Sequence, residues 1–229
     1  MELRRWLYPK RTRWVRVAER CLLFAAVLLG TVTMAPQLLA WPYSAEIGHT
    51  IVYSEEPIPP QLAGVLARAD ALAARSPIAE ANLERSLFLT DGGWRWDLLS
   101  LTSHGAFALR RPFRDAIIVN ASNVLADRVE NGAPVGGVRT LSGVIAHETT
   151  HIFVAHHLGE WRALLLPTWK TEGYADYVAD ESSLSDQDYA QLHANGADRP
   201  AMFYYEARRR VGEALAHNGN NVDRLLRSD

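Results

Sequence analysis

The residues best suited to chemistry lie in one short stretch, His147-Glu148-Thr149-Thr150-His151, which has the form HExxH. On a helix, four residues turn through about 400°, so the two histidines share one face and can bind one metal ion. Glu148 is one position further round, where it can flank the ion and accept a proton from an attacking water molecule. The motif therefore indicates hydrolysis assisted by Zn²⁺, although HExxH also occurs by chance on structural helices.

A catalytic zinc site needs a third protein ligand and leaves its fourth position open. Glu172 lies on a second expected helix, and a hairpin of two helices can bring its carboxylate to the ion. Asp176 follows four residues later on the same face, where it can accept the free N–H of a ligand histidine. The alternative is a solvated helix face, but this face is unusually apolar because it includes Trp169, Tyr174 and Tyr177.

A rival third ligand is His157, which follows His151 by six residues, as in the HExxHxxGxxH motif of metzincins. That motif requires a glycine for a sharp backbone turn, and this chain has Val154 at the position. Without the turn, six helical residues rotate His157 by about 240° away from the metal-binding face. We therefore expect His156 and His157 to be polar residues near the end of a helix.

Downstream of HExxH the chain has the pattern P-x-W-x-x-E-G-x-A-x-Y, from Pro167 to Tyr177. With these motifs the sequence resembles the gluzincins, zinc peptidases whose third ligand is a glutamate, and in particular their small peptidase-MA-like members. The resemblance covers residues 105–227. It implies a zincin-like fold in which Glu172 is the third ligand and Asp176 supports a ligand histidine. It also implies an upstream edge strand that receives the substrate chain.

Two segments could supply this edge strand by strand addition, residues 116–120 (AIIVN) and 105–109 (GAFAL). A peptidase also needs a donor to the oxyanion, and related families take a Tyr or His from a later helix. Tyr204 is the first choice because it shares a helix face with apolar residues. Tyr205 is the second choice and His193 a weaker one, and either tyrosine could instead simply cap the core.

The spacing of apolar residues predicts an α+β fold, with a small N-terminal sheet followed by a helical C-terminal half. We expect strands at residues 86–90, 106–109 and 116–120. We expect helices at residues 61–75, 141–158, 168–180, 185–194, 200–217 and 221–227. Residues 42–60 contain three closely spaced prolines and are predicted to form a linker, so the zinc peptidase domain would span residues 61–229.

Residues 21–40 carry no charge. At about 1.5 Å per residue, this stretch is long enough to cross a hydrocarbon core of roughly 30 Å. Seven basic side chains lie within residues 1–20, before the apolar run, and Trp41 and Tyr43 follow it as interfacial aromatics do. We therefore expect a cytoplasmic segment at 1–20, a transmembrane anchor at 21–41 and an extracytoplasmic domain. A cleaved signal sequence and a buried core helix are the alternatives.

Composition excludes several classes of function. Residues 21–229 carry 17 basic and 24 acidic side chains, which does not suit a nucleic-acid groove. Cys21 is the only cysteine, so an internal disulfide, a cysteine metal site and thiol catalysis are excluded. We expect a membrane-anchored zinc peptidase that acts on a peptide or protein. The alternatives are a non-catalytic zinc-binding module and an amide hydrolase of the cell envelope. The residue pattern fixes neither the cleavage specificity nor the oligomeric state.

Overall fold

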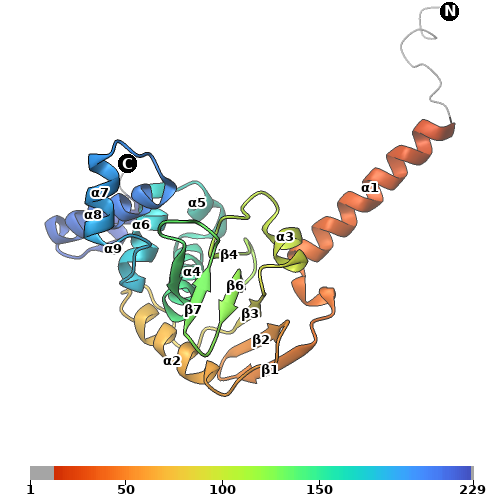
Figure 1. Cartoon of the computed structure of the whole chain (residues 1–229), viewed down its shortest axis with the longest axis horizontal. Helices are drawn as coiled ribbons and strands as arrows, with labels where there is room; N and C mark the ends of the chain where they lie inside the picture. Colours follow the sequence, from red (N-terminus) through yellow and green to blue (C-terminus); the bar gives the residue numbers. More distant parts are fainter. Residues whose placement is uncertain (1–12, 228–229) are drawn as a thin grey trace, which may run out of the picture. The chain divides into compact units, whose positions relative to one another are not determined.

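The computed structural model describes residues 13–227 of the 229-residue chain (Figure 1). By internal contacts the chain divides into two units, residues 1–39 and 40–229. Residues 1–12, which make up most of the basic segment predicted at 1–20, lie outside the described residues.

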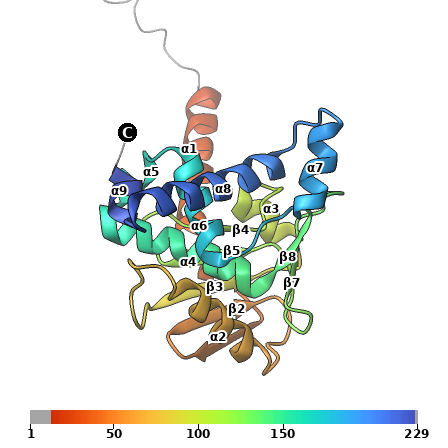
Figure 2. The ribbon, with the colours of Figure 1, turned by 90° about the vertical axis from the view of Figure 1, so that its left-hand side faces the viewer.

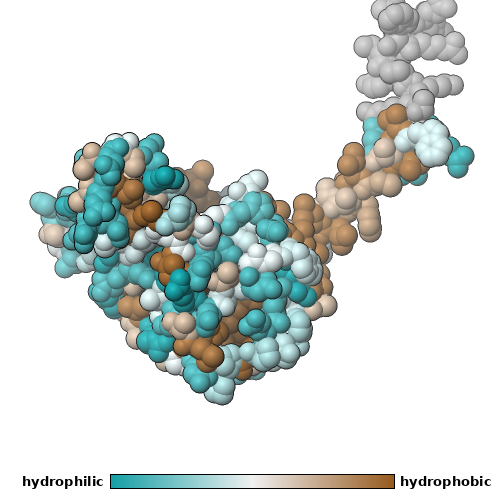
Figure 3. All heavy atoms as spheres, viewed as in Figure 1, coloured by the Kyte–Doolittle hydropathy of each residue, from teal (hydrophilic) through white to brown (hydrophobic). Residues whose placement is uncertain are grey.

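The first unit contains α1 (Arg13–Met34) and a short 3-10 helix, η1 (Pro36–Leu39). By length and composition, α1 is apolar enough to cross a membrane, and Figure 3 shows apolar side chains along it. The helix begins eight residues before the predicted span and ends at Met34. The end is explained by Pro36, because proline lacks an N–H and disfavours helical conformation in the residue before it.

The second unit is built on a five-stranded sheet with the strand order β1-β2-β3-β5-β4. Its strands are β1 (Tyr43–Ile47), β2 (Thr50–Ser54), β3 (Arg85–Leu89), β4 (Ala108–Arg110) and β5 (Ala116–Val119). Strands β2, β3 and β5 are parallel, whereas the edge strands β1 and β4 run antiparallel to their neighbours. A separate antiparallel sheet contains β6 (Ala121–Asn123), β7 (Arg128–Glu130) and β8 (Val138–Thr140).

The hairpin of β1 and β2 occupies the segment that we predicted to be a linker, so that prediction is wrong for residues 43–54. The strands turn through Gly48, whose φ of 60° is a conformation that glycine adopts without strain. Buried positions alternate with more exposed ones along β2, as expected of a strand with one face on the core. The prolines that suggested a linker all follow Ser54, after the hairpin has ended.

Helices form the rest of the second unit. They are α2 (Leu62–Ala73), α3 (Trp94–Ser100), α4 (Leu141–Leu158), α5 (Glu160–Leu164), α6 (Thr168–Ala179), α7 (Asp186–Ala194), α8 (Pro200–Asn218) and α9 (Val222–Arg227). All six predicted helices are present, with ends within two residues of the expected positions, and the three predicted strands are β3, β4 and β5. The mixed α+β class is therefore confirmed.

Helix α4 occupies the centre of this unit, in contact with α2 and α6 (Figure 2). Most of its 18 residues are buried. The buried residues include those directly before and after His147 and His151. The hydroxyl of Thr140 caps its first turn by accepting a hydrogen bond from Gly143 N at 3.0 Å. The helix ends at Gly159, which has a φ of 84°.

Helix α6 packs closely on α8, and a glycine makes the close approach possible. A Cβ atom at Gly173 would collide with the carbonyl oxygen of Ala207. The packing places the first turns of α8 near the face of α6 that carries Glu172. The three helices α4, α6 and α8 thus bring together residues from three separate parts of the sequence.

Candidate metal centre

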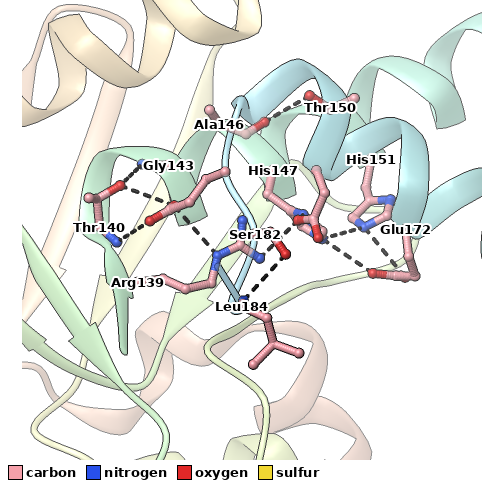
Figure 4. Close-up of polar contacts among 12 residues, drawn as sticks. Arg139, Thr140, Gly143, Ala146, His147, Thr150, His151, Glu172, Ser182 and Leu184 are labelled. Carbon is pink, nitrogen blue, oxygen red and sulfur yellow. Dashed lines mark hydrogen bonds and ion pairs between the residues drawn. The ribbon is translucent and has the colours of Figure 1, made fainter. Parts of the chain in front are cut away.

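The side chains of His147, His151 and Glu172 converge between α4 and α6 (Figure 4). The Nε2 atoms of the two histidines are 3.1 Å apart. Glu172 places Oε2 at 3.3 Å from His147 Nε2 and Oε1 at 3.6 Å from His151 Nε2. Histidines four residues apart share a face of α4, and α6 presents the carboxylate to that face.

The triad fits a metal ion. In a tetrahedral zinc site with bonds of about 2.0–2.1 Å, neighbouring ligand atoms lie about 3.3–3.4 Å apart. The two histidine nitrogens are 3.1 Å apart, the nearest carboxylate oxygens, Oε2 and Oε1, lie 3.3 and 3.6 Å from them, and one ligand atom from each residue falls within 4.8 Å of the others. Two imidazoles and one carboxylate are also a ligand set of catalytic zinc sites, which leave one position open. Among residues 13–227, these three side chains therefore form a possible metal-binding site.

Asp176 orients the first histidine of the triad. Its buried Oδ1 accepts a hydrogen bond from His147 Nδ1 at 2.7 Å and lies 2.9 Å from Nη1 of Arg139. Because a carboxylate only accepts, Nδ1 carries a hydrogen, and Nε2 is the nitrogen that can bind a metal ion once its own proton is released. The structure thus brings Asp176 to the position that the sequence predicted for it.

Arg139, on β8, is part of this site and was missed by the sequence analysis. Its buried guanidinium lies between Asp176 and Glu181, with Nε 3.5 Å from Glu181 Oε2. Glu181 also accepts hydrogen bonds from the backbone N–H and the hydroxyl of Thr140, at 2.7 and 3.1 Å. Gly143 leaves room for this carboxylate, since a Cβ there would collide with Glu181 Oε2. The only signal in the sequence is that Arg139 closely precedes the HExxH helix.

The charges around the triad favour a cation. Burial alone would lower the pKa of His147, but the Asp176 carboxylate, with Glu172 and Glu148, outweighs it and raises the pKa to about 10. Burial would raise the pKa of Glu172, yet His151 and His147 hold it far below its ordinary value. In the metal-free protein, the extra proton on His147 balances the charge of the Asp176 and Glu172 carboxylates. A bound metal ion would replace this proton.

The triad opens onto a cavity of about 830 Å³, which Glu148 and Tyr204 also line. Glu148 follows His147 on α4, so it faces the cavity without joining the triad. Tyr204 reaches the cavity from the start of α8. Burial, followed by the carboxylates of Glu172, Asp176 and Glu148, raises the pKa of Tyr204 to about 12. The phenol therefore keeps its proton at neutral pH and can donate a hydrogen bond.

Tyr205 does not line this cavity, although the sequence left it open as a second choice. Its hydroxyl donates to Asp186 Oδ1 at 2.7 Å, and its ring stacks on Tyr189 with centroids 4.3 Å apart. His193 stacks on the same Tyr189 and also lies outside the cavity wall. Successive helical residues point about 100° apart, so the two tyrosines face different surroundings.

Strand β4 bounds the cavity with Ala108 and Arg110 and is an edge of the sheet. The segment 105–109 therefore overlaps an edge strand, as one of the two predictions requires. The other prediction, an edge at 116–120, is wrong because β5 lies between β3 and β4. All four residues of β5 are buried, and such an uninterrupted apolar run is typical of an interior parallel strand.

The two remaining histidines of α4 bind carboxylates outside the triad. His157 Nε2 lies 2.8 Å from Asp223 Oδ1. His156 lies between Glu80 and Asp115, with a nearest oxygen of each at 2.9 Å. His157 is thus not in a position to act as a third ligand with His147 and His151.

No protein-family model, curated protein or solved structure matches this chain. The interpretation of the site therefore rests on its own geometry. That geometry defines a class of site: two helical histidines and a glutamate, an adjacent buried carboxylate, and an edge strand along the same cavity.

Proposed function

We propose that this protein is a membrane-anchored zinc peptidase of the gluzincin type, with a zincin-like domain that follows α1. The proposal rests on one observation above all: His147, His151 and Glu172 bring their ligand atoms within 4.8 Å of one another, beside Glu148 in the same cavity. Three protein ligands suit a catalytic zinc ion, since a structural one normally has four.

When bound, Zn²⁺ would polarise the scissile carbonyl and lower the pKa of a water molecule. Glu148 acts as the general base, because its carboxylate lies in the cavity beside the triad and is not needed as a ligand. It receives the proton of the water and passes it to the leaving amine. Asp176 and Arg139 hold His147 in the tautomer that presents Nε2 to the cavity.

The substrate chain binds along the free edge of β4, where backbone groups can pair with an added strand. In this mode of binding the affinity comes from main-chain hydrogen bonds, so a short edge strand can bind peptides of different sequence. Tyr204, which keeps its proton at neutral pH, donates to the oxyanion of the tetrahedral intermediate. Helix α1 is retained as the anchor, with the N-terminus in the cytoplasm and the cavity outside it.

The decisive experiment compares the full-length wild type with Glu148→Gln, purified in mild detergent. The zinc content is measured by elemental analysis. Peptide hydrolysis is measured with a library of quenched fluorescent peptides. We expect about one zinc per chain in both proteins and a loss of roughly 10²–10⁴-fold in turnover for Glu148→Gln. Glu206→Gln is the matched control, because Glu206 is an exposed carboxylate of α8 that accepts a hydrogen bond from Tyr189 and does not line the cavity.

Several outcomes would contradict the proposal. A well-folded wild type without zinc rules out the metal site, and equal turnover in Glu148→Gln rules out the general base. Zinc without hydrolysis of any peptide favours the non-catalytic module. Hydrolysis confined to cell-envelope amides favours the amide hydrolase. The contacts of His156 and His157 argue against the module, because a four-ligand structural site would need one of them.

A further inference from the structure

An apolar patch lies beside the mouth of the cavity, on α5 and on the turn between β4 and β5. We define the patch by four exposed residues: Phe113, Trp161, Leu164 and Leu165. Trp161, Leu164 and Leu165 recur at helical spacing on one face, and Leu165 is 83% exposed. The ring of Phe113 meets that of Trp161 edge to face, with centroids 5.0 Å apart. The two segments thus form one continuous surface.

The patch is held in place by its surroundings. Arg110 on β4 makes two hydrogen bonds to Glu160 on α5, at 2.6 and 3.1 Å, and both side chains are largely buried. Phe113 has a φ of 60°, a conformation that costs energy for a bulky residue. This backbone turn keeps its ring exposed at the tip of the hairpin. Exposed aromatic and leucine side chains on a fixed surface are typical of an interaction site.

Two arginines give the patch a positive border. Arg114 follows Phe113 and Arg162 follows Trp161, and both are exposed. Within residues 13–227, neither guanidinium has an ion pair. The nearby carboxylates are already bound, Asp115 by His156 and Glu160 by Arg110. A Trp and Phe surface bordered by free arginines is complementary to the interface of an anionic lipid bilayer.

The short connection between α1 and the second unit favours a membrane surface as the partner of the apolar patch. From the end of α1 at Met34 to the start of the second unit at Ala40 the chain extends at most about 20 Å. If α1 is retained in the bilayer, as proposed above, the second unit stays close to the lipid surface. We propose that the apolar patch docks onto the lipid interface of this membrane, with Arg114 and Arg162 at the headgroups.

Docking would place the cavity close to the lipid surface. Pro112 and Leu164 line the cavity, and their neighbours Phe113 and Leu165 belong to the patch. The substrate class that follows is a peptide segment that lies near a membrane surface, such as the part of a membrane protein next to its span. This step rests on the proposed peptidase function, whereas the docking itself can be measured without any activity.

The single cysteine of the chain makes a spin-label experiment possible. Cys21→Ser removes the native thiol, and Leu165→Cys or Leu125→Cys then adds one label site. Leu125 is the matched control because it is an exposed leucine, 72% accessible, in the turn between β6 and β7. The full-length chain is reconstituted into vesicles of phosphatidylcholine and phosphatidylglycerol. Accessibility of the label to oxygen and to a water-soluble nickel chelate is then measured.

We expect the label at position 165 to lose access to the chelate and gain access to oxygen, while the label at 125 stays open to the chelate. Arg114→Gln with Arg162→Gln should lower the equilibrium constant for docking onto anionic vesicles by roughly fivefold per arginine. Equal chelate access at 165 and 125 would overturn the proposal. Protection from both reagents with spin–spin broadening would also overturn it, because a second copy of the chain would then cover the patch.

Discussion

Helix α4 carries two pairs of histidines, and the structure gives them opposite surroundings. His147 and His151 are four residues apart and turn their Nε2 atoms toward each other and toward Glu172. His156 and His157 are adjacent, so they point in different directions, and each binds carboxylates of other segments. The same residue type on the same helix thus forms a possible metal site at one place and ion pairs at another.

The difference depends on which groups the two ring nitrogens of each histidine face. Both nitrogens of His156 face carboxylates, Glu80 on one side and Asp115 on the other, so both donate and neither keeps a lone pair. In His147, Nδ1 faces Asp176, whereas Nε2 lies 3.1 Å from His151 Nε2 and 3.3 Å from Glu172 Oε2, so it points to the two groups with which it could share a metal ion. His156 bridges two carboxylates with no second histidine beside it, whereas His147 has one carboxylate behind Nδ1 and meets His151 and Glu172 at Nε2, as a metal ligand requires.

The largest effect that we expect from the difference between the two histidine pairs is on zinc content. Glu172→Gln should abolish stoichiometric zinc binding, because an amide oxygen is a much weaker ligand than a carboxylate. His157→Ala should keep one zinc per chain, since its ring binds Asp223 instead of the triad. Elemental analysis of the full-length variants measures both.

The reverse pattern would break the comparison. Zinc lost in His157→Ala and kept in Glu172→Gln would make His157 the third ligand, which requires a different path of the chain after His151. Zinc kept in both variants would show that neither residue is a necessary ligand. Circular dichroism of each variant checks that the fold is intact before its zinc content is read.

The second test concerns two neighbouring tyrosines. Tyr204→Phe should lower kcat by about 10²–10³-fold, the range found when an oxyanion donor is removed, with little change in KM. Tyr205→Phe should leave kcat unchanged, because its hydroxyl binds Asp186 outside the cavity. Steady-state hydrolysis of one peptide by both variants provides the comparison. An equal loss in the two variants would show that α8 acts only through its packing.

The sequence was sufficient to predict the parts of the site that follow local rules. Histidine spacing places His147 and His151 on one face of a helix, and the bounds of α4 are those that apolar periodicity predicts. Asp176 lies one turn after Glu172, so that one correctly predicted helix delivers both carboxylates. These relations hold within single helices, where the period of 3.6 residues determines which side chains share a face.

The parts that sequence reasoning missed depend on pairing between distant segments. The edge position belongs to β4 and not β5, and only the order of the strands decides this. Arg139 lies on a three-residue strand, which is too short for a period-2 pattern to be recognised. The sequence ranked Tyr204 before Tyr205 but left both open, and only the packing of α8 on α6 shows that Tyr204 alone lines the cavity.

The third test sharpens the role of the carboxylate behind His147. Asp176→Asn should weaken zinc binding by about 10–100-fold, as is usual when a partner of a ligand histidine is changed. The amide no longer carries the charge that favours a cation next to Arg139. Asp180→Asn is the control, because Asp180 ends the same helix but binds Arg75 and Arg208, neither of which lines the cavity. Competition with a chromophoric chelator measures both affinities, and equal values would remove Asp176 from the site.

The smallest expected effect concerns the ion pairs of His156. Burial alone would lower its pKa, but Glu80, followed by Asp115, outweighs this and raises the pKa above its ordinary value. A pKa that is higher in the folded state means that the contribution to stability is present below pH of about 6.5 and is lost as the pH rises through the folded value. Because these side chains are about one-third exposed or more, solvent screening limits the contribution to about 1 kcal/mol.

The variant His156→Gln tests this in urea unfolding of the zinc-loaded protein at pH 6 and pH 9. We expect it to be less stable than wild type by about 1 kcal/mol at pH 6 and by much less at pH 9. His217→Gln is the control, because His217 is exposed and bonds only to the carbonyl of Glu213 on its own helix. A deficit of equal size at both pH values would mean that His156 stabilises the fold by packing and not as a bridging cation. In that case the two histidine pairs of α4 would differ in position but not in charge.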